Sequence, residues 1–415
     1  MDKQLSVRLH GQPVGILAQD EAGKMSFQYL PAAHQALSMS LPLQSEPFDN
    51  KLTQAYFGGL LPEDNEVRKL IAKKHSVSPK NDFSLLKAIG KDCAGAVSFC
   101  SIDEETSGAD FVELTGTPLT NEELAQHIND LPKKPLFSGV KDFRLSLAGV
   151  QEKAAVSVID RQICIPTLGT PTTHILKPMI REFQETIENE YLCLKTAKAM
   201  GIEVPNAEIK TSSGVKYLLI ERYDREIKDN KIKRVHQEDF CQALGSNSLY
   251  KYQNEGGPTL KDCFDLLRKV SQPAVDRNKL AERVVFNYLM GNTDAHSKNF
   301  SLLHYDNGTI KLAPMYDVLC APVYNELTKK MAMKIGGYYE YDSILARHWE
   351  RFCKDVGFSY PQLKKIIIKQ ANELPALIKN EIESLSAQNM PVDIANKIQE
   401  FVSQNCAKTL KRFEG

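Results

Sequence analysis

The most informative string in the sequence is Asn292-Thr-Asp-Ala-His-Ser-Lys-Asn299, in which Asp294 precedes an amide residue by five positions. A carboxylate can orient a hydroxyl group and accept its proton, and an amide carbonyl oxygen is a hard ligand suited to Mg²⁺. Further along the chain, Asp317 offers a second oxygen ligand. Protein kinases transfer a phosphoryl group from ATP to a hydroxyl with Asp, Asn and Asp in this order.

The elements predicted around this string support the same chemistry. The apolar residues of 280–290 predict a helix that leads into it, and Asp306-Asn-Gly308 predicts the turn of a hairpin that follows it. A polar surface loop beside a capped helix would explain the string alone. The order of helix, loop, hairpin and acidic residue favours a catalytic loop followed by a metal site.

Lys177 lies in the string His174-Ile-Leu-Lys177, which predicts a short strand closed by Pro178. A lysine that becomes buried among apolar neighbours needs an anionic partner. The α- and β-phosphates of ATP could be that partner, together with Glu188 or Glu190 on the helix predicted to follow. The alternative is an exposed lysine whose aliphatic stem covers apolar surface.

A segment between two predicted strands, upstream of Lys177, lies where a loop that covers phosphates would be expected. Its single glycine, Gly149, makes it neither a Walker loop nor a G-x-G-x-x-G loop, although a glycine would allow the backbone to approach a phosphate closely. An ordinary hairpin is the alternative. The candidate phosphate-contacting residues are Ala148, Gly149, Val150, Gln151, Glu152 and Lys153.

The apolar strand predicted at 215–221 ends in the polar string Glu221-Arg-Tyr-Asp224. Such an ending suits a hinge between two lobes. There, backbone groups of Glu221, Arg222 and Tyr223 could hydrogen-bond adenine, and the ring of Tyr223 could stack on it. A strand that ends in a surface turn is the alternative.

Length and composition set the frame for these motifs. The chain has 415 residues, which predicts two or three lobes. Lys and Arg number 52, as do Asp and Glu, so no overall charge drives binding to nucleic acid or membranes. Nine cysteines without a C-x-x-C pair argue against disulfides and zinc and favour the cytoplasm. We expect no signal peptide and no membrane span.

The remaining patterns predict a β meander at 5–29, a polar loop at 103–120 and a linker at 131–135. Beyond residue 237 we expect helices interrupted by a single hairpin at 300–312. Further predicted helices lie at 54–59, 65–75, 82–89, 188–200 and 343–415, and further predicted strands at 143–147 and 154–159.

Taken together, the motifs resemble the HipA-type serine/threonine kinases, the toxins of bacterial toxin–antitoxin pairs. The resemblance spans nearly the whole chain, and its strings occur in the family's order. The matching strings are Leu37 to Leu43, Tyr56 to Glu63, Asp142 to Lys153, Thr172 to Lys177, Asn189 to Tyr191, Glu221 to Asp224, Gln237 to Gln242, Thr293 to Phe300, and Tyr316 with Asp317.

The resemblance implies an α+β chain with a two-lobed, phosphoinositide-kinase-like fold. It implies an N-terminal β-containing subdomain at 1–130, a nucleotide-covering part at 136–235 and a mainly helical C-terminal lobe at 236–415. It further implies that ATP and Mg²⁺ are the cofactors. His296, Ser297, Lys298 and Tyr316 join the nucleotide-binding candidates on this basis.

The resemblance also implies regulation and partners. Ser146 would be an autophosphorylation site whose modification displaces the 148–153 loop and switches the kinase off. The substrate would be a serine of a translation-related protein, because glutamyl-tRNA synthetase, an aminoacyl-tRNA synthetase, is the family's best-known target. A small helix-turn-helix antitoxin, HipB-like, would hold the kinase and bind operator DNA, and no membrane would be involved.

Two other functions remain open at this point. A small-molecule or lipid kinase can use the same acidic loop, and the identity of the acceptor would separate it from a protein kinase. A regulatory scaffold that acts as corepressor with its antitoxin is the non-enzymatic alternative.

Overall fold

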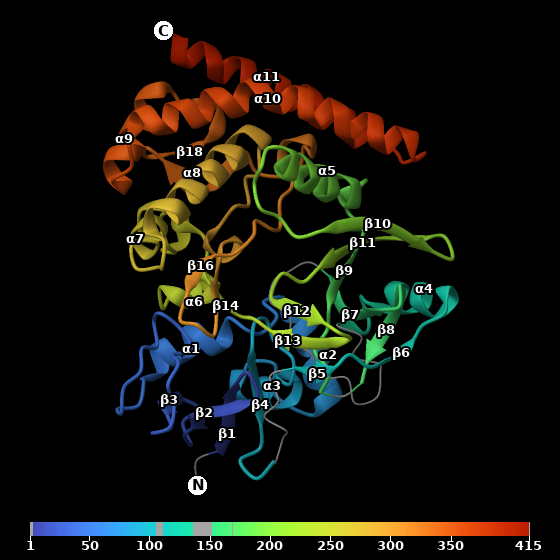
Figure 1. Cartoon of the computed structure of the whole chain (residues 1–415), viewed down its shortest axis with the longest axis vertical. Helices are drawn as coiled ribbons and strands as arrows, with labels where there is room; N and C mark the ends of the chain where they lie inside the picture. The colour runs from blue at the N-terminus through green and yellow to red at the C-terminus, as the bar shows by residue number, and fades with distance from the viewer. Residues whose placement is uncertain (1–2, 105–110, 136–151, 168, 415) are drawn as a thin grey trace. The chain divides into compact units, whose positions relative to one another are not determined.

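The computed structural model of this protein describes residues 3–104, 111–135, 152–167 and 169–414. The chain forms two compact units (Figure 1). Unit 1 contains Met1–Pro178, Lys210–Leu249 and Ser301–Ile310, and unit 2 contains Met179–Ile209, Tyr250–Phe300 and Lys311–Gly415. The predicted α+β class is confirmed.

The N-terminal part of unit 1 is an antiparallel sheet with strand order β3-β2-β1-β4. Alternating apolar side chains of these strands face a buried core, as Leu5, Val7 and Leu9 do in β1. The meander predicted at 5–29 is thus confirmed as β1 (Lys3–Leu9), β2 (Gln12–Gln19) and β3 (Met25–Tyr29). The fourth strand of the sheet is β4 (Val97–Cys100), which pairs with β1.

Three helices contribute to the same core: α1 (Asn50–Gly58), α2 (Asn65–His75) and α3 (Asp82–Ile89). In each, the residue before the first turn accepts a hydrogen bond from a backbone N–H of that turn, which explains why the helix begins there. The predictions for 65–75 and 82–89 are confirmed, and the helix predicted at 54–59 begins earlier.

The second sheet of unit 1 has six strands in the order β10-β11-β9-β7-β8-β6. Its central strand β9 carries Lys177 between β7 and β11. One face, which includes Val156 and Leu176, packs with Leu124 of helix α4 (Asn121–Asp130). The strands are β6 (Gly116–Pro118), β7 (Ala154–Ile159), β8 (Gln162–Pro166), β9 (His174–Pro178), β10 (Ala207–Ser212) and β11 (Val215–Glu221).

The prediction of one loop over 103–120 is wrong within the described residues. That stretch contains β6 and β5 (Val112–Glu113), and β5 joins the sheet β12-β13-β5. Strands of two or three residues are too short to show a period-two pattern, so their partners define them. The hairpin strands are β12 (Arg225–Lys228) and β13 (Lys231–Arg234).

A buried polar cluster fastens the segment 37–41 to the sheet β14-β15-β16. Glu238 accepts hydrogen bonds from Met39 N and from His304 Nε2, at 3.0 Å and 2.9 Å. His236 donates from Nε2 to Leu37 O at 2.7 Å. The strands are β14 (His236–Asp239), β15 (Ser301–His304) and β16 (Ile310–Leu312), and the short helix α6 (Phe240–Ala243) follows β14.

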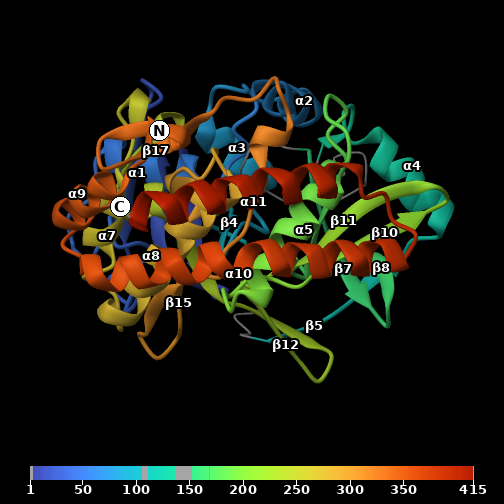
Figure 2. The same ribbon diagram turned by 90° about the horizontal axis from the view of Figure 1, so that it is seen from above.

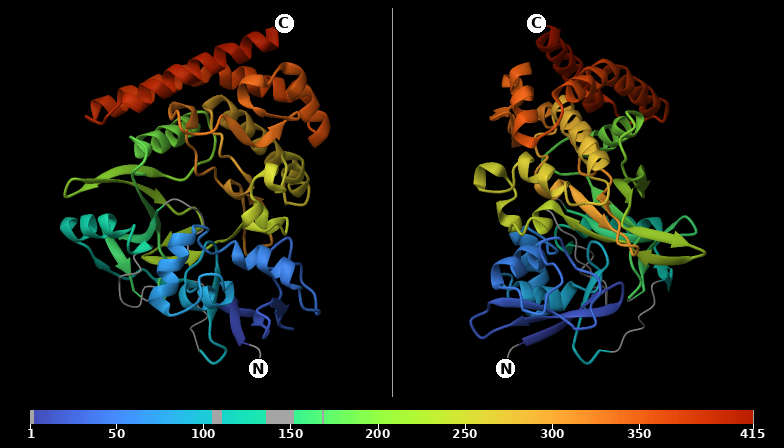
Figure 3. Two further views of the ribbon diagram at one scale, coloured as in Figure 1. Left: turned by 180° about the vertical axis from the view of Figure 1, so that it is seen from behind. Right: turned by 60° about the vertical axis from the view of Figure 1, so that its left-hand side comes forward.

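Unit 2 is mainly helical. Long helices α10 and α11 run side by side and pack against α5 and α8 (Figures 2 and 3). Trp349 of α9 is fully buried, with its ring edge-to-face on Tyr288. The helices are α5 (Thr186–Ala199), α7 (Leu260–Leu266), α8 (Pro273–Met290), α9 (Ala346–Val356), α10 (Tyr360–Ala387) and α11 (Asp393–Glu414).

The prediction of a single hairpin beyond residue 237 is wrong. Strands β17 (Lys330–Ile335) and β18 (Tyr338–Glu340) form a second one. Its turn uses Gly336 and Gly337, both with positive φ, a conformation that glycine adopts at little cost. Separately, no helix of the described residues is both long enough and apolar enough to cross a bilayer.

The polar cluster predicts a pH-dependent stability for unit 1. Burial, and then the nearby charge of His304, holds the pKa of His236 well below its usual value. Unfolding therefore allows this ring to take up a proton below about pH 6.5. The free energy of unfolding should fall from pH 7.5 to 5.5, by up to about 1.4 kcal/mol per pH unit from this group.

Hydrogen–deuterium exchange of β14 in graded urea at both pH values measures this dependence. We expect a shallower pH dependence in His236→Gln. The matched control His34→Gln changes an exposed histidine and should keep the wild-type dependence. An unchanged slope in His236→Gln would contradict the assignment.

Candidate active site

The predicted catalytic loop begins where α8 ends. Gly291, with φ of 75°, closes the helix by donating to Asn287 O and Tyr288 O. A Cβ at this position would lie 2.6 Å from the ring of Phe401, so the tight exit requires glycine. Asn292 adds a hydrogen bond from its backbone N to Asn287 O at 2.8 Å. These contacts fix the direction in which the chain leaves the helix.

Asp294 and Asn299 are held together by the loop itself. Asn299 donates from Nδ2 to the backbone oxygen of Asp294 at 3.0 Å, and His296 N donates to the same oxygen at 2.7 Å. A short 3-10 helix, η4 (Ser297–Asn299), ends the loop. The Asp294 side chain is exposed, whereas His296, Ser297, Lys298 and Asn299 are buried. A carboxylate at the surface of a rigid loop can meet an incoming hydroxyl.

The residue before the second predicted metal ligand, Asp317, contacts this loop. Tyr316 donates from its hydroxyl to Lys298 O at 2.7 Å, which brings the neighbours Asp317 and Asn299 to the same region of unit 2. Asp317 has a φ of 58°, in the left-handed region, which is uncommon for a residue other than glycine. Backbone strain of this kind clusters at functional sites.

The side chains present fit a Mg²⁺ ion. Because Nδ2 of Asn299 is engaged with Asp294 O, the amide is oriented and its Oδ1 is the atom left to act as a ligand. With the carboxylate of Asp317, this gives two hard oxygen donors. Mg²⁺ prefers such oxygens and commonly takes one or two from protein, with phosphates and waters completing its shell.

Lys177 is buried at the centre of the six-stranded sheet, where it pairs with Leu218 of β11. The prediction of a buried strand lysine is therefore confirmed. Its candidate partners, Glu188 and Glu190, are both buried on α5, in unit 2. The choice between them stays a prediction.

Part of the predicted phosphate loop lies outside the described residues. This applies to Ser146 and to Ala148, Gly149, Val150 and Gln151. Glu152 and Lys153 are described, half-buried and immediately before β7. Their roles at phosphates stay predictions.

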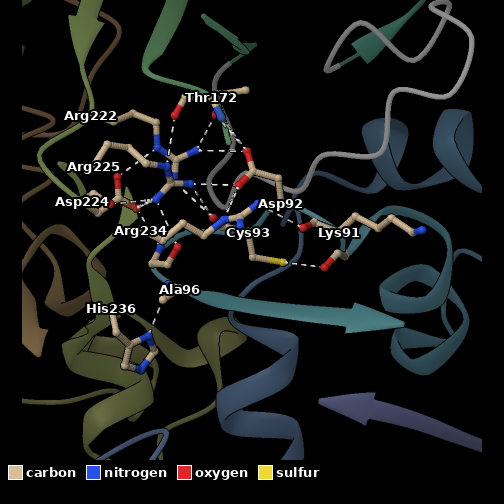
Figure 4. A network of polar contacts seen from close by, with 12 residues as sticks. Lys91, Asp92, Cys93, Ala96, Thr172, Arg222, Asp224, Arg225, Arg234 and His236 are labelled. Carbon is tan, nitrogen blue, oxygen red and sulfur yellow. Dashed lines mark hydrogen bonds and ion pairs between the residues drawn. The ribbon is translucent and has the colours of Figure 1, made fainter. Parts of the chain in front are cut away.

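The predicted hinge residues follow β11 directly. Glu221 ends the strand opposite His174, and Tyr223 is half-buried. The Arg222 side chain, unlike those of Glu221 and Tyr223, is buried. Its guanidinium donates two hydrogen bonds to Asp224, of 2.9 Å and 2.7 Å (Figure 4). Its backbone N donates to Thr173 O. The Arg222 side chain is thus part of an internal network.

That network is centred on Asp92, which lies in the loop between α3 and β4 (Figure 4). Asp92 Oδ1 accepts from Arg225 Nη2 at 3.0 Å and from Arg234 Nε at 3.1 Å. Its Oδ2 accepts from the hydroxyl of Thr172 at 2.9 Å. Burial alone would raise the pKa of Asp92, but the nearby arginines, Arg225 foremost, lower it to about 2. The carboxylate is therefore charged and fully partnered.

Sequence reasoning missed one residue beside the catalytic loop. Tyr252 donates from its hydroxyl to Asp294 Oδ1 at 2.7 Å. The string Lys251-Tyr-Gln-Asn-Glu-Gly-Gly257 shows a turn through its paired glycines. Nothing in the spacing ties that turn to a loop some forty residues later.

Comparison with known proteins finds two family profiles that match this chain. Residues 145–378 match the profile of the HipA-like C-terminal domain, and residues 5–100 match that of the HipA N-terminal domain. Asp92 and Arg222 fall in different matched regions, so the buried network joins the two.

Individual proteins similar to this chain are also named as kinases or as HipA. A Sinorhizobium fredii protein named "Putative kinase Y4mE" is 41% identical, covering 92% of each chain. The serine/threonine-protein kinase toxin HipA of Shewanella oneidensis is 30% identical, over 83% of this chain and 81% of that protein. A solved structure of Shewanella oneidensis HipA with HipB and its operator DNA matches with a TM-score of 0.86 and 25% identity, covering 99% of this chain and 98% of that one.

The buried network predicts a large effect from a single substitution. Asp92→Ala would leave three arginine side chains, those of Arg222, Arg225 and Arg234, short of negative charge. Removing one partner of a buried ion pair typically costs about 3–5 kcal/mol. The control Glu113→Ala removes an exposed partner of Lys231 and should cost less than about 1 kcal/mol. Hydrogen–deuterium exchange of β9 and β11 in graded urea measures the loss of unfolding free energy in both variants. Equal losses in Asp92→Ala and Glu113→Ala would contradict the role of Asp92 as the centre of the network.

Proposed function

This chain belongs to the HipA family, and we propose that it is an ATP-dependent serine/threonine-protein kinase acting as the toxin of a toxin–antitoxin pair. The observation that carries the proposal is the loop of unit 2 that presents Asp294 at the surface, holds Asn299 against the Asp294 carbonyl and accepts a hydrogen bond from Tyr316, the residue before Asp317. The names of the relatives, kinase and serine/threonine-protein kinase toxin, support the same activity.

In the proposed reaction, Asp294 accepts a hydrogen bond from the acceptor hydroxyl and takes its proton. The hydroxyl oxygen forms a bond to the γ-phosphorus of ATP, and the bond from that phosphorus to the departing ADP breaks. Positioning and electrostatics supply most of the rate in such transfers. The exposed carboxylate of Asp294 on a hydrogen-bonded loop suits this task.

Other residues would bind the nucleotide and metal. Asn299 and Asp317 are the proposed Mg²⁺ ligands, and bound Mg²⁺ would neutralise part of the phosphate charge. Lys177 is the proposed contact of the α- and β-phosphates, through its ammonium. We assign adenine to the strand end that carries Glu221 and Tyr223, with Arg222 contributing through its backbone, because its side chain is held by Asp224.

Regulation, target and partners follow from the family as further parts of the proposal. Ser146 is the proposed autophosphorylation site, and an aminoacyl-tRNA synthetase is the proposed target. The proposed partner is a helix-turn-helix antitoxin, through which the complex binds operator DNA. The support is that the matching Shewanella oneidensis structure contains HipA with HipB and operator DNA.

Two substitutions test the catalytic assignment. Asp294→Asn keeps the shape of the side chain but removes the proton acceptor, and should slow phosphate transfer by about 10²- to 10⁴-fold. Asp317→Asn should lower the rate at least as much, because a charged metal ligand is lost. The readout is phosphate incorporated from labelled ATP into protein. Asp355→Asn, on the exposed part of α9, is the matched control and should keep the wild-type rate.

Wild-type rates in both catalytic variants would contradict the proposed site. The acceptor separates the remaining alternative: labelling of an aminoglycoside or a lipid headgroup, with none of protein serine, would indicate a small-molecule or lipid kinase. Calorimetry with Mg-ATP tests the corepressor alternative, which requires antitoxin binding without nucleotide binding.

The toxin role has its own test. Overproduction of the wild-type chain without an antitoxin should arrest growth, and Asp294→Asn should relieve the arrest because phosphate transfer is lost. Colony counts after induction measure this. Unimpeded growth with an active kinase would contradict the toxin role while leaving the kinase activity intact.

A further inference from the structure

The proposed reaction assigns no role to Tyr252, whose phenol contacts the proposed base Asp294. Tyr252 Oη lies 2.7 Å from Asp294 Oδ1 and donates a hydrogen bond to it. Both residues belong to unit 2, and Tyr252 is half-buried whereas Asp294 is exposed. A charged acceptor makes this bond stronger than one between neutral groups. The contact therefore helps to order the exposed Asp294 carboxylate.

The position of Tyr252 is fixed from two sides. Its ring packs edge-to-face on His296 of the catalytic loop, with centroids 5.1 Å apart. The residue before it, Lys251, accepts a hydrogen bond through its backbone oxygen from Ser297 Oγ at 3.2 Å. The next residue, Gln253, accepts one through Oε1 from Lys334 N of β17 at 2.8 Å. The segment that carries the phenol is thus bound to the catalytic loop and to a neighbouring strand.

The turn after Tyr252 completes this arrangement. Gly257 N donates to Tyr252 O at 2.9 Å. A Cβ at position 257 would lie 2.1 Å from Tyr250 O and 2.8 Å from Tyr252 O, so the chain folds back on itself more tightly than any side chain would permit. Strand β17 also binds the catalytic loop, because Ala332 N donates a hydrogen bond to Thr293 O at 2.8 Å. A rigid frame therefore surrounds the phenol.

We infer that Tyr252 is a positioning residue, whose hydroxyl holds one oxygen of the Asp294 carboxylate so that the other oxygen faces the acceptor hydroxyl. A carboxylate has two oxygens and about four acceptor sites, so one can be held while the other takes the proton. The inference rests on the proposed kinase activity and names a further residue needed for it. Small misplacements of a reacting group cost up to about 10²-fold in rate.

The contact between Tyr252 and Asp294 could also inhibit the reaction. The phenol could occupy the place of the acceptor hydroxyl and obstruct it, in which case removing the hydroxyl would speed the reaction. The positioning role predicts a slower reaction with unchanged nucleotide binding. The direction of the change in rate therefore decides between them.

Tyr252→Phe removes only the hydroxyl and keeps the ring that packs on His296. The matched control is Tyr250→Phe, which removes a phenol hydroxyl from the same segment at a side chain that is 55% exposed. Dephosphorylated protein is mixed with labelled ATP, and intact-mass spectrometry gives the maximal rate of self-phosphorylation and the ATP concentration for half that rate.

We expect Tyr252→Phe to lower the maximal rate by about 10- to 100-fold. The half-saturating ATP concentration and the melting temperature should stay at their wild-type values, which a merely structural role would not produce together. Tyr250→Phe should match wild type in all three. In an Asp294→Asn background, Tyr252→Phe should change the residual rate less than about two-fold, because residues that act as a unit are not additive.

Several results would overturn the inference. An unchanged or faster maximal rate in Tyr252→Phe would remove the positioning role alone, since wild type would still be an active kinase. A full further loss in the Asp294→Asn background would show that Tyr252 acts independently of Asp294. A wild-type chain that transfers no phosphate from ATP to itself or to any protein would overturn the proposed function, and the role of Tyr252 with it.

Discussion

A carboxylate removed from water must be met by positive charge and hydrogen-bond donors, and Asp92 of unit 1 meets this requirement with partners from several segments. Its partners come from Thr172 before β9 and from Arg225 and Arg234 on the β12–β13 hairpin. These segments lie far apart in the sequence, so the charge is satisfied only when all of them are in place. The strand end that carries the proposed hinge is therefore fastened to the N-terminal sheet by buried ion pairs.

Unit 2 meets the opposite requirement, because a proton acceptor must stay accessible. Asp294 is left at the surface, and its orientation depends on the backbone around it and on the hydroxyl of Tyr252. Asn299 Nδ2 and His296 N both bond the Asp294 carbonyl oxygen, so the loop is rigid although the side chain is exposed. Rigidity here comes from many short-range hydrogen bonds, whereas in unit 1 it comes from a few long-range charges.

The difference between short-range and long-range interactions also explains which features the sequence could predict. The β1 meander, α2 and α3 show clear apolar periods and side-chain caps, which are local signals. Asp294 and Asn299 lie within one turn of chain, so their spacing carried the chemistry. Strand β5 was missed because pairing with a distant segment, rather than a pattern of its own, defines it.

Arg222 and Tyr252 show where local reasoning ends at the site. The string at 221–224 indicated polar residues after a buried strand, which suits contact with a nucleotide, but only the partners reveal that the Arg222 guanidinium is occupied by Asp224. The string therefore indicates a role for the Arg222 backbone, and it does not reveal what the Arg222 side chain binds. Tyr252 is the reverse case. Its string carries no chemical signal, yet folding sets its hydroxyl 2.7 Å from the one carboxylate that the proposed reaction requires as a base. Spacing along the chain identifies groups that act within one loop, and groups that act across loops are identified by the contacts they make.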